Sequence, residues 1–208
     1  MLQFQPHWNQ GPQSDYTQIY HKKGVFNDQM IAHLEQMVHR EYKFEKGMTG
    51  IAERGTVKYS GTNNRDIAYI QPNESSHWLY DLLFPLALEA NSKHYHFDID
   101  TVTDPIHYVI YPEDEGHLDW HYDVGALGVN RRKLAMTVQL SDSNDYTGGE
   151  FQIMSGGSKG GGEGVITLPR EKGDVMVFPS FLMHRVAPIK SGRRKCLVFW
   201  TGSNRSFR

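Results

Sequence analysis

Residues 117–123 read HLDWHYD, and the last three of them, His121-Tyr122-Asp123, guide the interpretation of the whole chain. Side chains two positions apart in an extended strand lie on the same face, so His121 and Asp123 can reach one ion. His184 lies in a later strand-like segment and offers a second imidazole. Two imidazoles and one carboxylate can hold a transition metal by one face and leave other coordination positions open. The sequence therefore predicts a metal site formed by these three residues.

Two other H-x-D triplets are present in this chain, which contains 11 histidines. His96-Phe97-Asp98 follows an expected helix and precedes the strand-rich part, so we interpret it as a junction whose polar side chains reach water. His117-Leu118-Asp119 shares one strand face with His121 and Asp123. On spacing alone, the His117 triplet remains an alternative ligand pair.

From His107 onward, short apolar or alternating runs are separated by Gly, Asp and Pro, and no long helical period appears. This pattern is typical of a jelly-roll sandwich. We expect strands at residues 105–111, 117–123, 133–140, 149–154, 164–168, 174–178, 181–187 and 195–202. The predicted fold class is therefore mainly β, with supporting N-terminal α-helices.

The first half of the chain contains two helical patterns. Asn27 is a suitable N-cap, and the apolar stripe that follows it predicts a helix over residues 27–42. Residues 47–64 are rich in Gly, Thr and Asn and are interpreted as a hairpin or loops. A second helix is expected over about residues 75–91, with a kink at Pro85.

Length and composition favour one intracellular domain. The 208 residues suffice for one sizeable core, so we expect a single domain with a support region, 1–104, and a core, 105–204. A formal net charge of -2 gives no global attraction to nucleic acid or membranes. A lone cysteine, Cys196, fits a reducing cytoplasm, and neither a signal peptide nor a long apolar stretch is seen. We therefore expect a soluble, cytoplasmic protein.

The segments around His121 and His184 occur in a characteristic order. They read LAMTVQL at 134–140, DYTGGEF at 145–151, KGDVMVFPS at 172–180 and HRVAP at 184–188, and the run ends with GRR at 192–194 and LVFW at 197–200. Together these segments resemble the catalytic domain of the 2-oxoglutarate- and Fe(II)-dependent oxygenases, most closely the prolyl 4-hydroxylase-like branch. The resemblance implies a double-stranded β-helix, Fe(II) held by His121, Asp123 and His184, and 2-oxoglutarate and O2 as cosubstrates. It also favours His121 and Asp123 over the His117 triplet.

The same resemblance implies a cation for the far carboxylate of 2-oxoglutarate. Arg194 follows His184 by ten residues, which is the spacing that the family uses. A guanidinium suits this task because its planar fork makes two charge-assisted hydrogen bonds to a carboxylate. A tyrosine is the usual second partner, and Tyr111 stands ten residues before His121, where relatives commonly show nine. Tyr108 is the alternative.

Other polar segments have two interpretations each. Thr137 and Gln139 form a polar strand face that suits a pocket wall or a solvent-facing side. The basic clusters Arg131–Lys133 and Arg193–Lys195 are interpreted as ordinary surface, with a rim for an acidic substrate as the alternative. The glycine-rich segment Ser155–Gly164 is interpreted as a connector, with a mobile lid as the alternative.

The resemblance makes hydroxylation of an unactivated C–H bond the leading function, with a peptidyl proline in a protein or peptide as the leading substrate. A small molecule or a nucleobase is the alternative substrate. A metal-binding jelly roll without oxygenase activity and a ligand-binding sandwich without metal are the alternative classes. Arg194 argues against the first of these, since a bare metal site does not need that cation, and the triad argues against the second.

Overall fold

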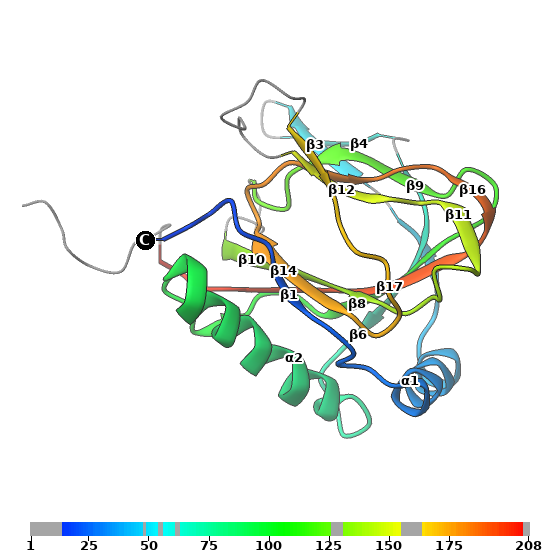
Figure 1. The fold of residues 1–208 in the computed structure, drawn as a ribbon, viewed down its shortest axis with the longest axis horizontal. Coiled ribbons are helices and arrows are strands. Elements are labelled where there is room, and N and C mark those ends of the chain that lie inside the picture. Colours follow the sequence, from blue (N-terminus) through cyan, green and yellow to red (C-terminus); the bar gives the residue numbers. More distant parts are fainter. Residues whose placement is uncertain are drawn as a thin grey trace, which may run out of the picture.

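The structure is a computed structural model that describes residues 14–47, 49–53, 56–60, 63–125, 131–154 and 164–205. Two β-sheets face each other, and the helices lie outside the larger one (Figure 1). The larger sheet has eight strands in the order β1-β14-β10-β17-β8-β6-β2, with β7 also paired to β17. Their bounds are β1 Tyr20–Lys22, β14 Val175–Pro179, β10 Arg132–Gln139, β17 Arg194–Gly202, β8 Ile106–Tyr111, β6 Asp66–Ile70, β2 Glu45–Lys46 and β7 Thr101–Val102.

The smaller sheet has five strands in the order β13-β12-β15-β9-β5. Their bounds are β13 Val165–Thr167, β12 Phe151–Met154, β15 His184–Val186, β9 His117–His121 and β5 Asn63–Asn64. Two further antiparallel pairs flank it, namely β11 (Tyr146–Gly148) with β16 (Ile189–Gly192), and β3 (Thr49–Glu53) with β4 (Thr56–Ser60). The two facing sheets confirm the predicted jelly-roll fold class.

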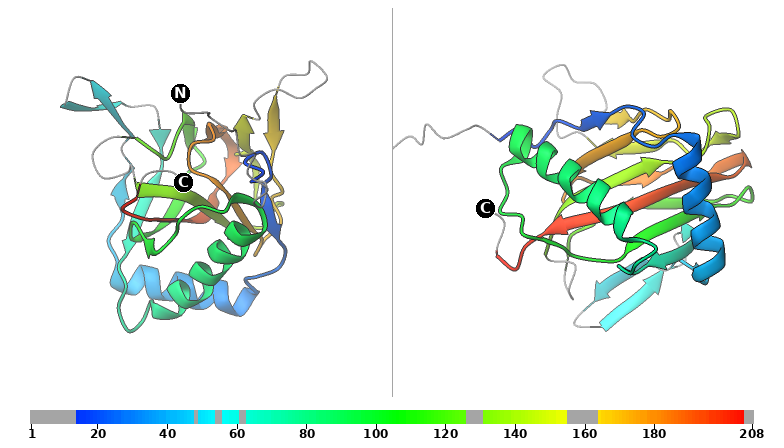
Figure 2. Two further views of the ribbon diagram at one scale, coloured as in Figure 1. Left: turned by 90° about the vertical axis from the view of Figure 1, so that its left-hand side faces the viewer. Right: turned by 90° about the horizontal axis from the view of Figure 1, so that it is seen from below.

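Two α-helices, found among the described residues, cover the outer face of the larger sheet (Figure 2). Helix α1 spans Asp28–Glu41, and the side chain of Asn27 caps it by accepting a hydrogen bond of 2.9 Å from the Met30 amide. Helix α2 spans His77–Ala90 and accommodates Pro85. Both predicted helices are therefore confirmed. None of the helices described is long and apolar enough to cross a membrane.

The eight predicted strands are all present, but four of them are at least two residues shorter than expected, namely those predicted at 117–123, 149–154, 164–168 and 181–187. The strand predicted at 117–123 ends at His121, so Asp123 lies just beyond the ladder. The strand predicted at 181–187 begins only at His184, because a turn precedes it in which the Leu182 amide donates to the carbonyl of Pro179. Helix α2 also continues into a π-helix, η1 (Asn91–Tyr95), that the sequence reading missed. The glycine-rich segment 155–164 falls almost wholly outside the described residues.

Alternation along the strands divides the core into two layers. On the outer face, strand residues pack under the helices, as Tyr108, Leu197 and Phe199 do with Leu34 and Leu83. On the inner face, the neighbouring strand positions fill the space between the sheets. Buried members of this inner layer are Val109, Tyr111, Leu118, Val186, Cys196, Ala135, Ile153, Phe178 and Trp200. The polar residues of the candidate site emerge from this inner layer.

Candidate metal centre

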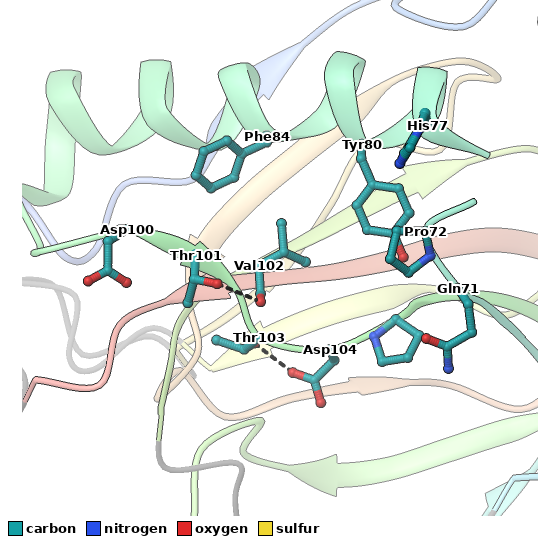
Figure 3. A pocket seen from close by; sticks show the side chains of 11 residues that line it. Gln71, Pro72, His77, Tyr80, Phe84, Asp100, Thr101, Val102, Thr103 and Asp104 are labelled. Carbon is teal, nitrogen blue, oxygen red and sulfur yellow. Dashed lines mark hydrogen bonds between the residues drawn. The ribbon is translucent and has the colours of Figure 1, made fainter. Parts of the chain in front are cut away.

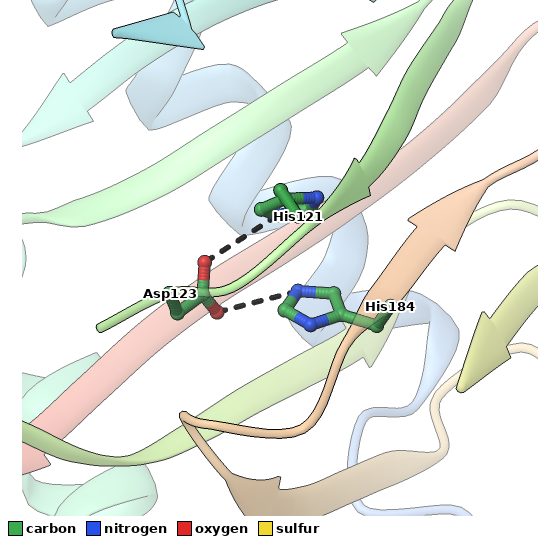
Figure 4. A group of neighbouring side chains, drawn as sticks. All are labelled: His121, Asp123 and His184. Atoms are coloured by element: carbon green, nitrogen blue, oxygen red, sulfur yellow. Dashed lines mark ion pairs between the residues drawn. The ribbon is translucent and has the colours of Figure 1, made fainter. Parts of the chain in front are cut away.

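His121, Asp123 and His184 converge between the sheets (Figure 4). Strands β9 and β15 are antiparallel neighbours, and their register places His121 opposite His184. The Nε2 atoms of His121 and His184 lie 3.5 and 3.4 Å from the two oxygens of Asp123. One potential ligand atom from each residue lies within 4.8 Å of the others. Among the described residues, no other group of three or more His, Cys, Asp or Glu side chains is arranged closely enough to hold a metal ion.

Backbone contacts aim both imidazoles at this point. Nδ1 of His121 is 2.8 Å from the carbonyl of Asp119, and Nδ1 of His184 is 2.8 Å from the carbonyl of Leu182. A carbonyl only accepts hydrogen bonds, so each Nδ1 carries a hydrogen and each Nε2 is left to face the Asp123 carboxylate or a metal ion. Such contacts set the tautomer and orientation of metal-binding histidines. The residues present therefore fit a divalent transition metal.

The carboxylate of Asp123 is buried and held from several sides. The Trp200 indole donates a hydrogen bond of 2.9 Å to Oδ2, and the Asp123 amide donates to the carbonyl of Ser180 at 3.0 Å. Burial raises the pKa of Asp123, but the charges and hydrogen bonds of His184 and His121 outweigh this effect and hold the pKa well below its ordinary value. The group is thus ionised, as a metal ligand must be.

Arg132 supports this arrangement from behind Trp200. Its guanidinium lies 4.0 Å from the centre of the Trp200 ring and donates to the Asp123 carbonyl at 3.3 Å. It also makes hydrogen bonds of 2.9 and 2.5 Å to the two carboxylate oxygens of Asp104. Sequence reasoning missed this contact because a cluster of basic residues carries no sign of its distant acidic partner.

The interpretation of Arg131–Lys133 as ordinary surface is consequently wrong for two of its three members. The Arg132 side chain is only 13% exposed. Lys133 is fully buried, and its ammonium donates to the carbonyl of Asp98 at 2.9 Å. Both side chains are used inside the protein, where their charges have specific polar partners.

Arg194 and Tyr111 lie side by side in the inner layer. They are paired residues of β17 and β8, and both are 2% exposed. The guanidinium carbon lies 5.4 Å from the centre of the Tyr111 ring, and Nη1 is 3.5 Å from the Cys196 sulfur. Within the described residues, no carboxylate pairs with Arg194. A buried guanidinium without a carboxylate partner is suited to binding an anion that enters the cavity.

The structure separates Tyr111 from the alternative, Tyr108. Tyr111 lines the cavity beside His121, Asp123 and His184. Tyr108 faces the helices instead, and its hydroxyl donates to Glu35 of α1 at 3.2 Å. The difference follows from strand alternation, because positions 108 and 111 lie on opposite faces of β8.

The two other H-x-D triplets do not join the metal-ligand group. Nδ1 of His117 is 2.6 Å from the carbonyl of Glu115, and Asp119 is exposed. His96 takes a left-handed backbone conformation, with φ 57°, just after η1.

The remaining polar candidates, Thr137 and Gln139, are buried, which supports the pocket-wall interpretation. Thr137 lines the cavity, and Gln139 donates to the Tyr146 hydroxyl at 2.9 Å.

A second, larger hollow of about 520 Å³ lies outside the sandwich, between α2 and the segment 100–105 (Figure 3). It is lined by Tyr80, Phe84 and Asp104, among others. Its size exceeds that of the inner cavity, but it contains no cluster of metal ligands among the described residues. The candidate site therefore lies in the inner cavity. The hollow is connected to it through the Asp104–Arg132 pair and through the hydrogen bond of 3.2 Å from the Thr103 amide to the Trp200 carbonyl.

Comparisons with known proteins agree with this site. Residues 106–202 match the family model of the 2OG-Fe(II) oxygenase superfamily. A PKHD-type hydroxylase of Synechococcus sp. (strain CC9902) is 40% identical over 86 residues, which cover 40% of this chain and 35% of the relative. One of Maricaulis maris (strain MCS10) is 34% identical over 83 residues, covering 40% and 35%. The match thus spans only about a third of the length of these curated relatives.

Solved structures with the same fold include two prolyl hydroxylases. One, from Trichoplax adhaerens, is in complex with a peptide fragment of the hypoxia inducible factor oxygen degradation domain; it has a TM-score of 0.69 at 15% identity and covers 88% of this chain and 83% of its own. The other, a Pseudomonas putida prolyl-4-hydroxylase, has a TM-score of 0.64 at 16% identity and covers 90% and 93%.

Residues 106–202, which carry the metal-ligand group, belong to the 2OG-Fe(II) oxygenase superfamily. The relatives reported above are PKHD-type hydroxylases, and the two solved structures that share the fold are prolyl hydroxylases. Membership implies Fe(II), 2-oxoglutarate and O2 as the cofactor and cosubstrates.

Proposed function

We propose that this protein is a 2-oxoglutarate- and Fe(II)-dependent dioxygenase that hydroxylates an unactivated C–H bond. The observation that carries the proposal is the presence, in one buried inner layer, of the His121–Asp123–His184 group and of the guanidinium of Arg194, which pairs with no carboxylate of the described residues. A metal site alone does not need a second buried charge. A cosubstrate with two carboxylates needs both features.

His121, Asp123 and His184 would hold Fe(II) by one face of its coordination sphere. When bound, Fe(II) with 2-oxoglutarate and O2 supplies the oxidising chemistry: one oxygen atom enters the C–H bond as hydroxyl, the other enters succinate, and CO2 is released. The protein's own task is to hold the ligands in their reactive orientation. Trp200 does so by donating its N–H to Asp123.

Arg194 and Tyr111 would bind the far carboxylate of 2-oxoglutarate. The guanidinium fork offers two charge-assisted hydrogen bonds, and the neighbouring phenol offers a third donor. Burial raises the pKa of Tyr111, so its hydroxyl keeps its proton and can donate. Apolar side chains such as Phe151, Phe178 and Val186 line the same cavity and exclude water from the polar groups.

A peptidyl proline is our leading substrate, supported by the names of the hydroxylases that share the fold, one of which is bound to a peptide. A small molecule remains the alternative. We further propose that residues 1–208 act as one domain, because β2 and β6 from the first half join the same sheet as β8 and β17. The buried free thiol of Cys196 supports a cytoplasmic site of action.

The test measures succinate formed from 2-oxoglutarate. Protein loaded anaerobically with Fe(II) and 2-oxoglutarate is exposed to air, with and without a panel of proline-containing peptides, and Asp123→Ala serves as the blank. We expect succinate above the blank and a product heavier by one oxygen for at least one peptide. Metal binding without succinate, for all conditions and over hours, would favour a non-catalytic metal-binding module instead.

A further inference from the structure

Arg65 reaches the same cavity from a place that the sequence reading did not consider. It stands between β5 and β6, where the chain passes from the smaller sheet to the larger one: Asn64 pairs with His117 of β9, and Asp66 pairs with Ile110 of β8. Its side chain lines the cavity together with Tyr111, Asp123 and the two metal-binding histidines. Arg65 is thus a cation that lines the inner cavity directly, whereas Arg194 is buried next to the cavity-lining Tyr111 and comes from a different part of the chain.

The guanidinium of Arg65 has no partner that neutralises it. Its Nε is buried without a hydrogen-bond partner, and no carboxylate among the described residues forms an ion pair with it. Three other half-buried arginines have polar partners for their guanidiniums: Arg132 pairs with Asp104, Arg170 donates to two backbone carbonyls, and Arg185 donates to the Gln152 side chain. The Tyr111 hydroxyl beside Arg65 is polar but uncharged. A half-buried charge that lines a cavity without a counterion is costly, which points to an anion that arrives with a ligand.

The cosubstrate does not supply that anion. Among the described residues that line the cavity, Asp123 is the acidic side chain. Burial, together with the charges of Arg132 and Arg65, lowers the pKa of the nearby His107 to about 3, so at neutral pH this histidine adds no positive charge to the cavity. Two guanidiniums and a divalent metal would face Asp123 and the two carboxylates of 2-oxoglutarate. One positive charge is then left over, and Arg194 already serves the far carboxylate in the proposed function.

We propose that Arg65 determines substrate specificity by binding a carboxylate of the molecule that is hydroxylated. In a peptide substrate this group is either an acidic side chain next to the target residue or the C-terminal carboxylate. The proposal rests on the proposed function for the location of 2-oxoglutarate. It narrows the substrate from any proline-containing peptide to one that carries a negative charge close to the reacting carbon.

The experiment compares binding of matched peptides to zinc-loaded protein with 2-oxoglutarate, which cannot turn over. Four short proline peptides carry Glu or Gln after the proline and end in a free acid or an amide. The variants are Arg65→Gln and, as a control, Arg170→Gln, because Arg170 is also half-buried with an unpartnered Nε but lies outside the cavity. Titration calorimetry measures both peptide and 2-oxoglutarate affinity, and thermal melting checks folding.

We expect wild-type protein and Arg170→Gln to bind one of the charged peptides about ten- to a hundred-fold more tightly than its amide counterpart, the range for a hydrogen-bonded charge pair. Arg65→Gln should lose this preference while its 2-oxoglutarate affinity stays unchanged. Comparing the Glu peptide with the free acid then tells which carboxylate is bound. Arg65→Lys should keep part of the preference, since it retains the charge but not the fork.

Three results for peptide binding overturn the proposal: no difference between acid and amide peptides in the wild type, a preference that survives in Arg65→Gln, or no binding of any of the four peptides. A loss of 2-oxoglutarate affinity in Arg65→Gln also overturns it and assigns Arg65 to the cosubstrate. Succinate formation by the wild type without peptide reports separately on the oxygenase function. A preference for acids without succinate formation would reject that function and retain Arg65 as a carboxylate-binding residue.

Discussion

Replacement of Trp200 by Phe tests whether the orientation of Asp123 controls metal binding. The change removes the indole N–H that donates to Asp123 Oδ2 at 2.9 Å, and it keeps an aromatic ring against Arg132 and His107. A hydrogen bond to a charged group contributes about 1.5–3 kcal/mol. If that contribution is lost only from the metal-binding conformation, metal affinity should fall by about ten- to a hundred-fold.

The assay is a zinc or Fe(II) titration under anaerobic conditions, followed by calorimetry or a competing chelator. Trp78→Phe is the matched control, because the Trp78 indole N–H has no hydrogen-bond partner among the described residues. The control should retain the wild-type metal affinity. Thermal melting of both metal-free variants separates a weakened site from a weakened fold.

Unchanged metal affinity in Trp200→Phe would refute the reasoning, because it would mean that the carboxylate is oriented without the indole. An equal loss in Trp78→Phe would refute it as well, since general destabilisation would then explain the effect. A selective loss in Trp200→Phe, with similar melting temperatures for the two variants, is the expected outcome.

Three further predictions concern the triad, the anion site and pH. Asp123→Ala should abolish metal binding in the same titration, whereas His117→Ala should retain it; the reverse would move the ligand pair. Arg194→Lys should raise the Kd for 2-oxoglutarate about ten- to a hundred-fold, measured by binding calorimetry on zinc-loaded protein. The same change at the exposed neighbour Arg193 should leave this Kd unchanged. Burial raises the pKa of Asp104, but Arg132 lowers it overall, so the ion pair stabilises the fold above the unfolded-state pKa and this contribution is lost as pH falls through the folded-state pKa. Urea unfolding should therefore show wild type more stable than Asp104→Asn at neutral pH, with the difference shrinking below about pH 4; a constant difference would contradict the assignment.

Local periodicity explains what could be predicted. Side chains alternate between the two faces of a strand. This alternation predicts that His121 and Asp123 point to the same side and that Arg193 and Arg194 point to opposite sides. The helix over 28–41 follows equally from its cap at Asn27 and its apolar stripe. In each case the deciding interactions connect residues that are close in sequence.

What could not be predicted depends on contacts between distant segments. Asp104 and Arg132 meet only because β7 and β10 both pair with β17, and nothing near either residue announces the other. Strands β11 and β16 were missed because they are short and contain glycines in left-handed conformations, Gly148 and Gly192. Arg65 was missed because the chain crosses between the two sheets at that point, where alternation along one strand no longer applies.

The position of Asp123 just beyond β9 explains why its support is spread over several groups. The two histidines are in ladder-forming strands, and each needs one backbone carbonyl to set its ring. Asp123 lies outside the strand, and three hydrogen bonds fix it instead. Its amide donates to the Ser180 carbonyl, its carbonyl accepts from Arg132, and its carboxylate accepts from the Trp200 indole. Removal of one contact should therefore displace the ligand and weaken metal binding in a graded way, whereas removal of the carboxylate itself should abolish it. The contrast between Trp200→Phe and Asp123→Ala measures this difference directly.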